Sequence, residues 1–171
     1  MGWVGPVTPA TPSSSRRWGN SWLRRLLLPL LILLLLPVQA AAQKMIALSF
    51  DDVPRGRGAF FMPDERTQRI IAELKKANAP QAVFFVNPGA IGQGDGVGGE
   101  ERIAAYVAAG HVIANHSNSH PRLSTTDTAA YLADIDAAEL WLKGRPGYRP
   151  WFRFPFLDEG GKDKAKRDAL R

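Results

Sequence analysis

The chain has 171 residues, no cysteine and a formal net charge of +6, from 22 basic and 16 acidic side chains. This length predicts about one domain, and the lack of cysteine excludes disulfides and thiolate-ligated metal sites. Hydrophobic residues make up 45% of the sequence, which excludes wholesale disorder. The first 42 residues contain four arginines and no acid, so the rest carries 18 basic against 16 acidic residues, or +2. The basic balance therefore gives no reason to expect a nucleic-acid partner.

The first 42 residues have the composition of a secretory signal peptide. Two arginine pairs precede the apolar run 26–36, and three alanines end the segment at Ala42. Because this run is far shorter than the about 20 residues that span a bilayer, we expect cleavage before Gln43. An uncleaved anchor is the alternative, which Pro37 disfavours, and a twin-arginine signal is a minor option. The expectation is an exported protein, periplasmic or extracellular, without a stable membrane span after cleavage.

The remaining residues, 43–171, alternate predicted strands with predicted helices. Short apolar runs predict buried strands at 45–50, 81–86, 111–115 and 150–154. Helical spacing of apolar residues predicts helices at 65–78, 100–109, 128–143 and 162–171. The first of these helices has Asp64 in position to cap it. The third follows a capping box at 124–127, and its inward stripe consists of Leu132, Ile135, Ala138 and Leu142. Strict alternation predicts parallel strands with helical crossovers, hence an open α/β sheet or a (β/α) barrel.

Polar side chains fall where three of the predicted strands end. Asp51 and Asp52 follow the first strand, His116 follows the third, and Arg153 lies at the end of the fourth. The carboxyl ends of the strands form the catalytic face in barrels and doubly wound sheets alike. Of two neighbouring aspartates, one can bind a cation while the other accepts a proton, although a solvated turn is the ordinary alternative.

The histidines indicate a metal site. His116 and His120 are four residues apart, close enough to reach one metal if the segment makes a helical turn. Two imidazoles and one carboxylate are a known catalytic zinc arrangement, and cobalt or nickel fits the same ligands. We interpret the third histidine, His111, as structural. Arg153, flanked by aromatic residues, needs a carboxylate partner, for which Asp51 is the natural candidate.

Three motifs together resemble those of a known family. The Ser-Phe-Asp-Asp of 49–52, the His-Ser-x-x-His of 116–120 and the Arg-x-Pro-Phe of 153–156 are similar to the first three motifs of polysaccharide deacetylases, the NodB-homology domain of carbohydrate esterase family 4. The resemblance extends from about Met45 to Arg171. It implies a distorted (β/α) barrel and metal-dependent removal of acetyl groups from N-acetylated sugars.

The resemblance also implies roles for particular residues. Asp51 would be the general base, and Arg153 would hold and tune it. The backbone N–H of Phe156, where the family usually has tyrosine, would help to stabilise the oxyanion. Three side chains would bind the divalent cation, usually zinc: Asp52, His116 and His120.

The sequence departs from the family pattern in two ways. Val53 replaces the glycine that commonly follows the two aspartates, so a β-branched side chain lies where the backbone usually turns freely. The family's fourth and fifth motifs are absent, and the last histidine is His120, so no histidine after Arg153 can act as general acid. We therefore expect a C-terminally incomplete deacetylase domain at 43–171, a partial barrel preceded by the signal peptide at 1–42.

These observations favour an exported, metal-dependent hydrolase that removes N-acetyl groups from a peptidoglycan-like or chitin-like glycan. One alternative is a catalytically inactive remnant that binds a metal or a glycan. Another is a deacylase of a small amide or ester. The identity of the glycan and the oligomeric state stay open at this point.

Overall fold

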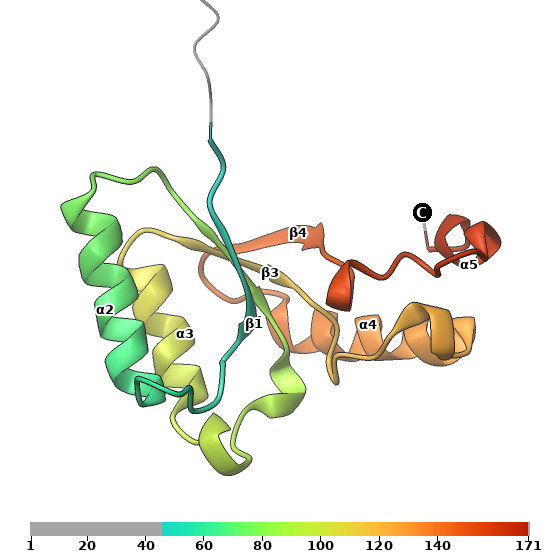
Figure 1. Ribbon diagram of the computed structural model, residues 1–171, viewed down its shortest axis with the longest axis horizontal. Helices are drawn as coiled ribbons and strands as arrows, with labels where there is room; N and C mark the ends of the chain where they lie inside the picture. The colour runs from blue at the N-terminus through green and yellow to red at the C-terminus, as the bar shows by residue number, and fades with distance from the viewer. Residues whose placement is uncertain (1–45, 171) are drawn as a thin grey trace, which may run out of the picture. The chain divides into compact units, whose positions relative to one another are not determined.

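The computed structural model describes residues 46–170, which form one parallel four-stranded sheet with helical connections (Figure 1). The strands are β1 (Ser49–Val53), β2 (Val83–Val86), β3 (Val112–Asn115) and β4 (Tyr148–Phe152). The helices are α2 (Pro63–Lys76), α3 (Gly99–Ala108), α4 (Thr128–Leu142) and α5 (Lys164–Asp168). Each strand pairs with the next along the chain, so the order is that of a (β/α) barrel and lacks the reversal of a doubly wound sheet. The predicted fold class is confirmed, and the predicted signal peptide lies outside the described residues.

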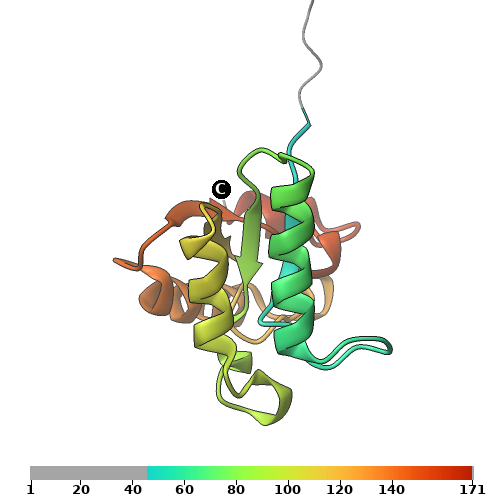
Figure 2. The ribbon, with the colours of Figure 1, turned by 90° about the vertical axis from the view of Figure 1, so that its left-hand side faces the viewer.

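Helices α2 and α3 cover one face of the sheet side by side (Figure 2). Phe84 of β2 is completely buried there, and its ring stacks on Tyr106 of α3 at 3.8 Å and on Phe50 of β1 at 4.8 Å between centroids. The Tyr106 hydroxyl donates to Thr67 Oγ1 of α2 at 3.2 Å, which links the two helices. Strands β2 and β3 are almost wholly buried, as expected for a parallel sheet packed under helices. Within residues 46–170, no helix combines the length and apolar character needed to cross a bilayer.

The carboxyl ends of the four strands are level with one another. Val53 pairs with Val86, Val86 with Asn115, and Asn115 with Phe152. The residues that precede or follow these positions therefore meet at one edge of the sheet.

The capping residues of two predicted helices are wrong in detail. Helix α2 begins with Pro63 directly after Met62, and Asp64 forms an ion pair with Arg102 at 2.9 Å instead of capping the helix. Proline suits the first helical turn because its missing N–H would have no partner there. Helix α4 is capped by Asp127, whose Oδ1 accepts from the backbone N–H groups of Ala129 and Ala130 at 2.9 and 3.2 Å.

The expected inward stripe of α4 is confirmed except at Leu132. Leu132 is 38% exposed, whereas Tyr131, Ala138 and Leu142 are buried. The direction of a helix face is set by its tertiary neighbours, which the apolar spacing of this alanine-rich segment leaves undetermined.

Arg102 of α3 is buried and orders the connection between β2 and α3. Its Nη1 donates to the carbonyl of Val97 at 2.9 Å as well as to Asp64, and its Nη2 donates to the carbonyl of Asp95 at 2.8 Å. These bonds satisfy a charge that would be costly to bury unpaired. The connection that they hold lies beside the edge of the sheet where the polar residues gather.

Candidate metal and catalytic site

A β-bulge places both aspartates of β1 at the carboxyl edge of the sheet. Phe50 pairs with Phe84 and Val53 with Val86, so Asp51 and Asp52 together lie opposite the single residue between them on β2. A bulge breaks the regular alternation of a strand and redirects a side chain. The side chains of two adjacent aspartates can therefore both lie at the same edge of the sheet.

The bulge depends on an unusual backbone conformation at Asp52, whose φ is +62°. Such angles are uncommon outside glycine, and they concentrate at functional sites. Val53, which replaces the family's glycine, is 5% exposed and packs in the core as the last residue of β1. The turn is made at Asp52, so the β-branched side chain is accommodated without strain at its own position.

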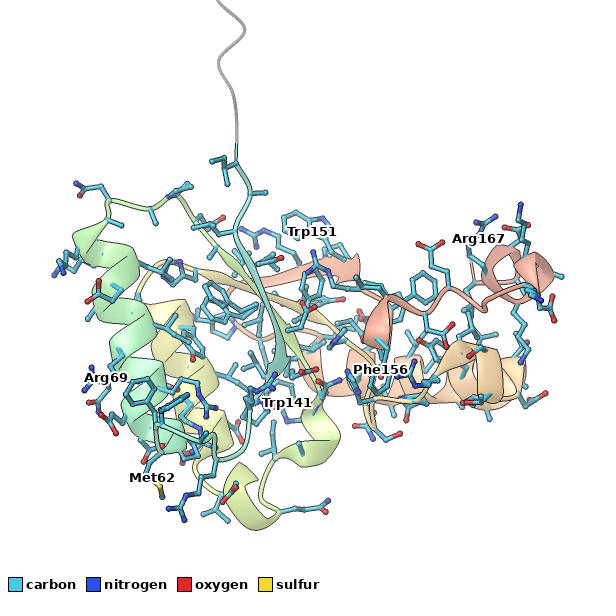
Figure 3. The ribbon with its side chains drawn as sticks, in the orientation of Figure 1. Met62, Arg69, Trp141, Trp151, Phe156 and Arg167 are labelled. Carbon is cyan, nitrogen blue, oxygen red and sulfur yellow. The ribbon has the colours of Figure 1, made fainter. Side chains whose placement is uncertain are left out.

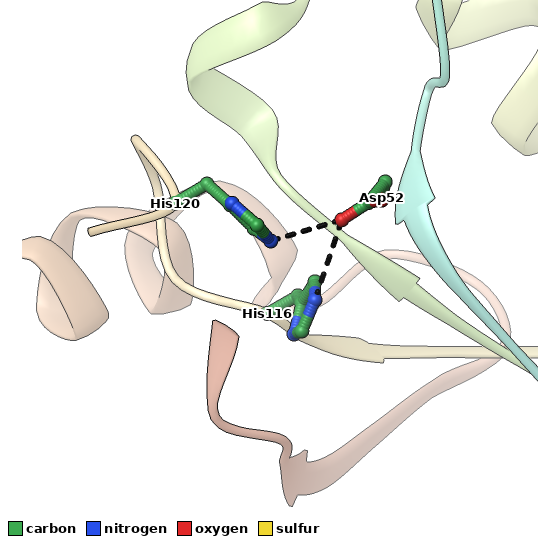
Figure 4. Close-up of side chains that lie close together, drawn as sticks. All are labelled: Asp52, His116 and His120. Carbon is green, nitrogen blue, oxygen red and sulfur yellow. Dashed lines mark ion pairs between the residues drawn. The ribbon is translucent and has the colours of Figure 1, made fainter. Parts of the chain in front are cut away.

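Asp52, His116 and His120 converge at this edge, as Figure 4 shows. Asp52 Oδ1 lies 2.9 Å from His120 Nε2 and 3.5 Å from His116 Nε2. One possible ligand atom from each side chain lies within 4.8 Å of the others. The sequence-predicted trio is therefore brought together.

The surroundings of His116 suit a metal ligand. The ring is 1% exposed, and its Nδ1 lies 2.8 Å from the carbonyl oxygen of Arg153, to which Nδ1–H donates. This bond fixes the tautomer that leaves the Nε2 lone pair directed at Asp52. Burial lowers the pKa of His116, opposed by the bond to Arg153 and by the charges of Asp51 and Asp52. The neutral imidazole that a metal requires is thus the favoured form.

The segment between the two histidines is not the helical turn that the sequence suggested. Ser117 and His120 have φ values of +64° and +63°, and the Ser117 hydroxyl accepts from the His120 backbone N–H at 3.2 Å. Asp134 of α4 fixes the middle of the segment, because its carboxylate accepts from the backbone N–H of Asn118 at 2.9 Å and from the Ser119 hydroxyl at 2.7 Å. The loop is therefore held by a side chain from a neighbouring helix.

Asp51 is paired with Arg153, as expected. Arg153 Nη1 lies 3.0 Å from Asp51 Oδ1, and it also donates to Ser49 Oγ at 2.8 Å. The guanidinium lies over the ring of Phe85 at 4.4 Å from its centroid. Both charged side chains are one-third exposed, so the pair is reachable from solvent yet held in a defined orientation.

Phe156 lies beside the candidate metal ligands, on the short turn after β4 (Figure 3). Its φ is +58°, and its ring contacts the edge of the His120 ring at 4.4 Å between centroids. Arg122 covers the ring of Phe156 at 3.8 Å. Phe156 thus borders the cluster of Asp52, His116 and His120.

Sequence reasoning missed two residues of this site. Arg55 Nη1 forms an ion pair with Asp52 Oδ2 at 2.8 Å, and Asp134 holds the loop of the second histidine. Arg55 could have been noticed from its place three residues after Asp52. The spacing of Asp134 within α4 contains no comparable indication.

The third histidine, His111, lies apart from the site. Its Nδ1 accepts from the Ala82 N–H at 3.3 Å, in keeping with a structural role.

The strand order and the carboxylate–imidazole cluster define a parallel (β/α) domain with a possible metal site at the carboxyl ends of its strands. A family profile described as "Polysaccharide deacetylase" matches residues 39–170. The chain belongs to this family.

Curated relatives agree with the family. A chitin deacetylase of Colletotrichum lindemuthianum is 26% identical over 121 residues, which cover 70% of this chain and 45% of the relative. A peptidoglycan-N-acetylglucosamine deacetylase of Bacillus cereus is 33% identical over 111 residues, 64% of this chain and 35% of the relative. The chain thus spans less than half the length of the curated relatives that it matches.

Solved structures show the same fold. The peptidoglycan deacetylase PdaC of Bacillus subtilis has a TM-score of 0.54 and 28% identity, covering 74% of this chain and 56% of its own. A family 4 carbohydrate esterase of Streptomyces lividans, solved with acetate, has a TM-score of 0.53 and 25% identity, covering 73% and 56%. These likenesses confirm the predicted NodB-type deacetylase domain.

Proposed function

We propose that the protein is an exported, metal-dependent hydrolase that removes N-acetyl groups from a cell-envelope polysaccharide of peptidoglycan or chitin type. The observation that carries the proposal is the convergence of Asp52, His116 and His120 next to the Asp51–Arg153 pair in a chain of the deacetylase family. Relatives are described as acting on chitin and on peptidoglycan N-acetylglucosamine, which supports this substrate class.

The donor set fits a divalent cation. One carboxylate oxygen and two imidazole nitrogens leave room for further ligands, which is the pattern of a catalytic zinc site. Zinc is the first choice, and cobalt or nickel would accept the same donors. When bound, the cation would polarise the acetyl carbonyl and ease the deprotonation of water.

The chain's own residues would supply the proton transfers and the orientation. The Asp51 carboxylate would accept a proton from the attacking water as general base. Arg153, bonded to Asp51 Oδ1 at 3.0 Å, would keep that carboxylate aimed at the site. The Phe156 backbone N–H would donate to the oxyanion that develops on the acetyl oxygen.

Metal content and acetate release test the proposal together. The purified chain is compared with an Asp52→Ala, His116→Ala, His120→Ala triple variant, with His111→Gln as a control outside the site. About one zinc per chain, absent from the triple variant and kept by the control, together with acetate from an N-acetylglucosamine oligomer or from peptidoglycan strands, is the expected result. Metal without acetate would favour an inactive binding domain, and no metal would overturn the site.

A further inference from the structure

A groove of about 780 Å³ opens beside the metal cluster, with Asp52 and His120 among its lining residues. This volume lies in the range of ordinary ligand pockets, about 300–1,000 Å³. One wall is the connection between β1 and α2, which contributes Arg55 and Arg57. The other wall comes from the connections that follow β2 and β3.

Three polar side chains of that second wall, those of Asn87, Gln93 and Ser119, already have partners within the protein. The Asn87 amide donates to the carbonyl oxygens of His116 and Ser117 at 2.5 and 3.1 Å. The Gln93 amide donates to the carbonyl of Gly89 at 3.0 Å. The Ser119 hydroxyl is likewise bonded to Asp134. These groups build the wall and offer few donors to a ligand.

The first wall offers guanidinium groups. Arg55 is 64% exposed, and its Nη1 bonds to Asp52 Oδ2 at 2.8 Å, which leaves its other N–H groups accessible. Arg57 is exposed, and its guanidinium makes no hydrogen bond or ion pair with any residue of 46–170. Only the backbone N–H of Arg57 is engaged, by Asp95 Oδ2 at 2.8 Å.

The loop that presents these arginines is held in place. Arg66 of α2 donates from Nη1 to the carbonyl oxygens of Gly56 at 2.7 Å and Arg55 at 3.4 Å, and from Nη2 to that of Phe61 at 3.3 Å. Together with the Asp95 bond, these contacts order the backbone from which Arg55 and Arg57 project. The groove therefore presents positive charge from a defined wall next to the metal ligands.

We propose that this groove selects an N-acetylated glycan that also bears a carboxylate, with Arg57 and Arg55 as the residues that recognise it. The inference rests on the proposed function and narrows its substrate class toward acidic sugars. A guanidinium binds a carboxylate through two parallel, charge-assisted N–H···O bonds. A neutral sugar has no carboxylate and cannot form them. Arg57 is the cleaner reporter of this selection, because Arg55 also contacts a metal ligand.

The experiment compares two substrates that differ only in charge. The acidic probe is a tetrasaccharide of alternating N-acetylglucosamine and N-acetylmuramic acid, and the neutral probe is its methyl ester. Because the arginines are exposed, we expect kcat/KM of the full chain to favour the acid by about two- to fivefold at low salt. The preference should shrink as salt screens the charges.

Single-residue variants test whether the preference for the acidic probe comes from Arg57. Arg57→Gln should lower kcat/KM for the acid toward the value for the ester and leave the ester unchanged, and Arg57→Lys should restore part of the difference. Arg149→Gln is the matched control, because it removes one exposed arginine near the start of β4, at the opposite edge of the sheet. Equal losses on both substrates, or no discrimination by the unmodified protein, would overturn the inference.

A binding titration separates this inference from the proposed function. The affinities for the acid and the ester are measured by calorimetry on the same variants, without any need for turnover. Tighter binding of the acid that depends on Arg57 would uphold the inference even if no acetate is released, and the proposed function alone would then fail. If acetate is released from both probes at equal rates and the two affinities are equal, the proposed function would stand and the inference on acidic sugars would fail.

Discussion

At the residue scale, the two aspartates of β1 have different partners although they are neighbours in the sequence. Asp51 pairs with Arg153, which also donates to Ser49, whereas Asp52 lies against two imidazoles and Arg55. The bulge and the positive φ of Asp52 separate the two carboxylates, so that one can serve as a base and the other as a ligand. Their roles should therefore be separable by mutation.

Replacing each aspartate singly tests that division. Asp51→Asn should lower acetate release by about 10²–10⁴-fold, because it removes the proton acceptor, while zinc stays bound. Asp52→Ala should abolish both, because it removes an anionic ligand. Zinc stoichiometry by elemental analysis and acetate release are measured on the same samples. Loss of zinc from Asp51→Asn would contradict the assignment.

At the element scale, the site depends on helices that contribute no ligand. Helix α4 supplies Asp134, which fixes the loop of His120, and its own start is fixed by Asp127. The bulge of β1 and the loop after β3 are irregular segments held by regular neighbours. Two predictions concern α4.

The first concerns the loop of His120. Asp134→Ala should weaken zinc binding by about tenfold, because residues that orient metal ligands typically contribute 10–100-fold to affinity. Asp136→Ala is the matched control on the same helix, since Asp136 is exposed and the change in helix propensity is identical. Zinc affinity is measured by competition with a chromogenic chelator. Equal effects of the two substitutions would contradict a role of Asp134 in holding the ligand loop.

The second concerns the start of the helix. Asp127→Ala should lower the free energy of unfolding by about 1 kcal/mol, because the N–H groups of Ala129 and Ala130 lose their acceptor. Asp127→Asn keeps an acceptor oxygen and should lose less. Urea denaturation followed by circular dichroism gives both values. A larger loss for Asn than for Ala would rule out capping as the cause.

At the scale of the whole molecule, the site joins segments that are far apart in the chain. The bond between Arg153 and Ser49 connects residues 104 positions apart, and it links the first strand of the sheet, β1, with the residue that follows the last strand, β4. The site therefore exists only when the sheet is formed, and conditions that loosen the core also dismantle the site. His111 directly precedes β3, at the end of the strand opposite the candidate metal ligands, and we expect it to make the stability of that core depend on pH.

Burial lowers the pKa of His111 below its ordinary value of 6.5. The unfolded chain then binds more protons than the folded one just below pH 6.5, so stability falls as the pH falls through this range. His111→Gln keeps an acceptor for the Ala82 N–H but does not titrate. The decline in unfolding free energy between about pH 7.5 and 5.5 should be shallower in this variant, by less than about 1.4 kcal/mol per pH unit. Parallel declines in urea denaturation would contradict this origin.

The sequence by itself determined the alternation of strands and helices and the chemistry of the site. Apolar runs and helical spacing are local patterns, so the four strands were placed to within a few residues. The motifs at 49–52, 116–120 and 153–156 predicted which residues form the site. These residues meet because parallel strands end at the same edge of the sheet. The ion pair between Asp51 and Arg153 is also predictable from the sequence, since a half-buried arginine needs a carboxylate partner.

Only the tertiary structure decided which sheet the strands form and which neighbours complete the site. The bulge at Asp51 and Asp52 follows from the register with β2, and the contacts of Arg102 and Asp134 join segments that have no local relation. Between His116 and His120 the structure has a loop in place of a helical turn, with left-handed residues at Ser117 and His120 and with its middle residues held by Asp134. Such features depend on the packing of distant segments, which the periodicity of a single segment does not encode.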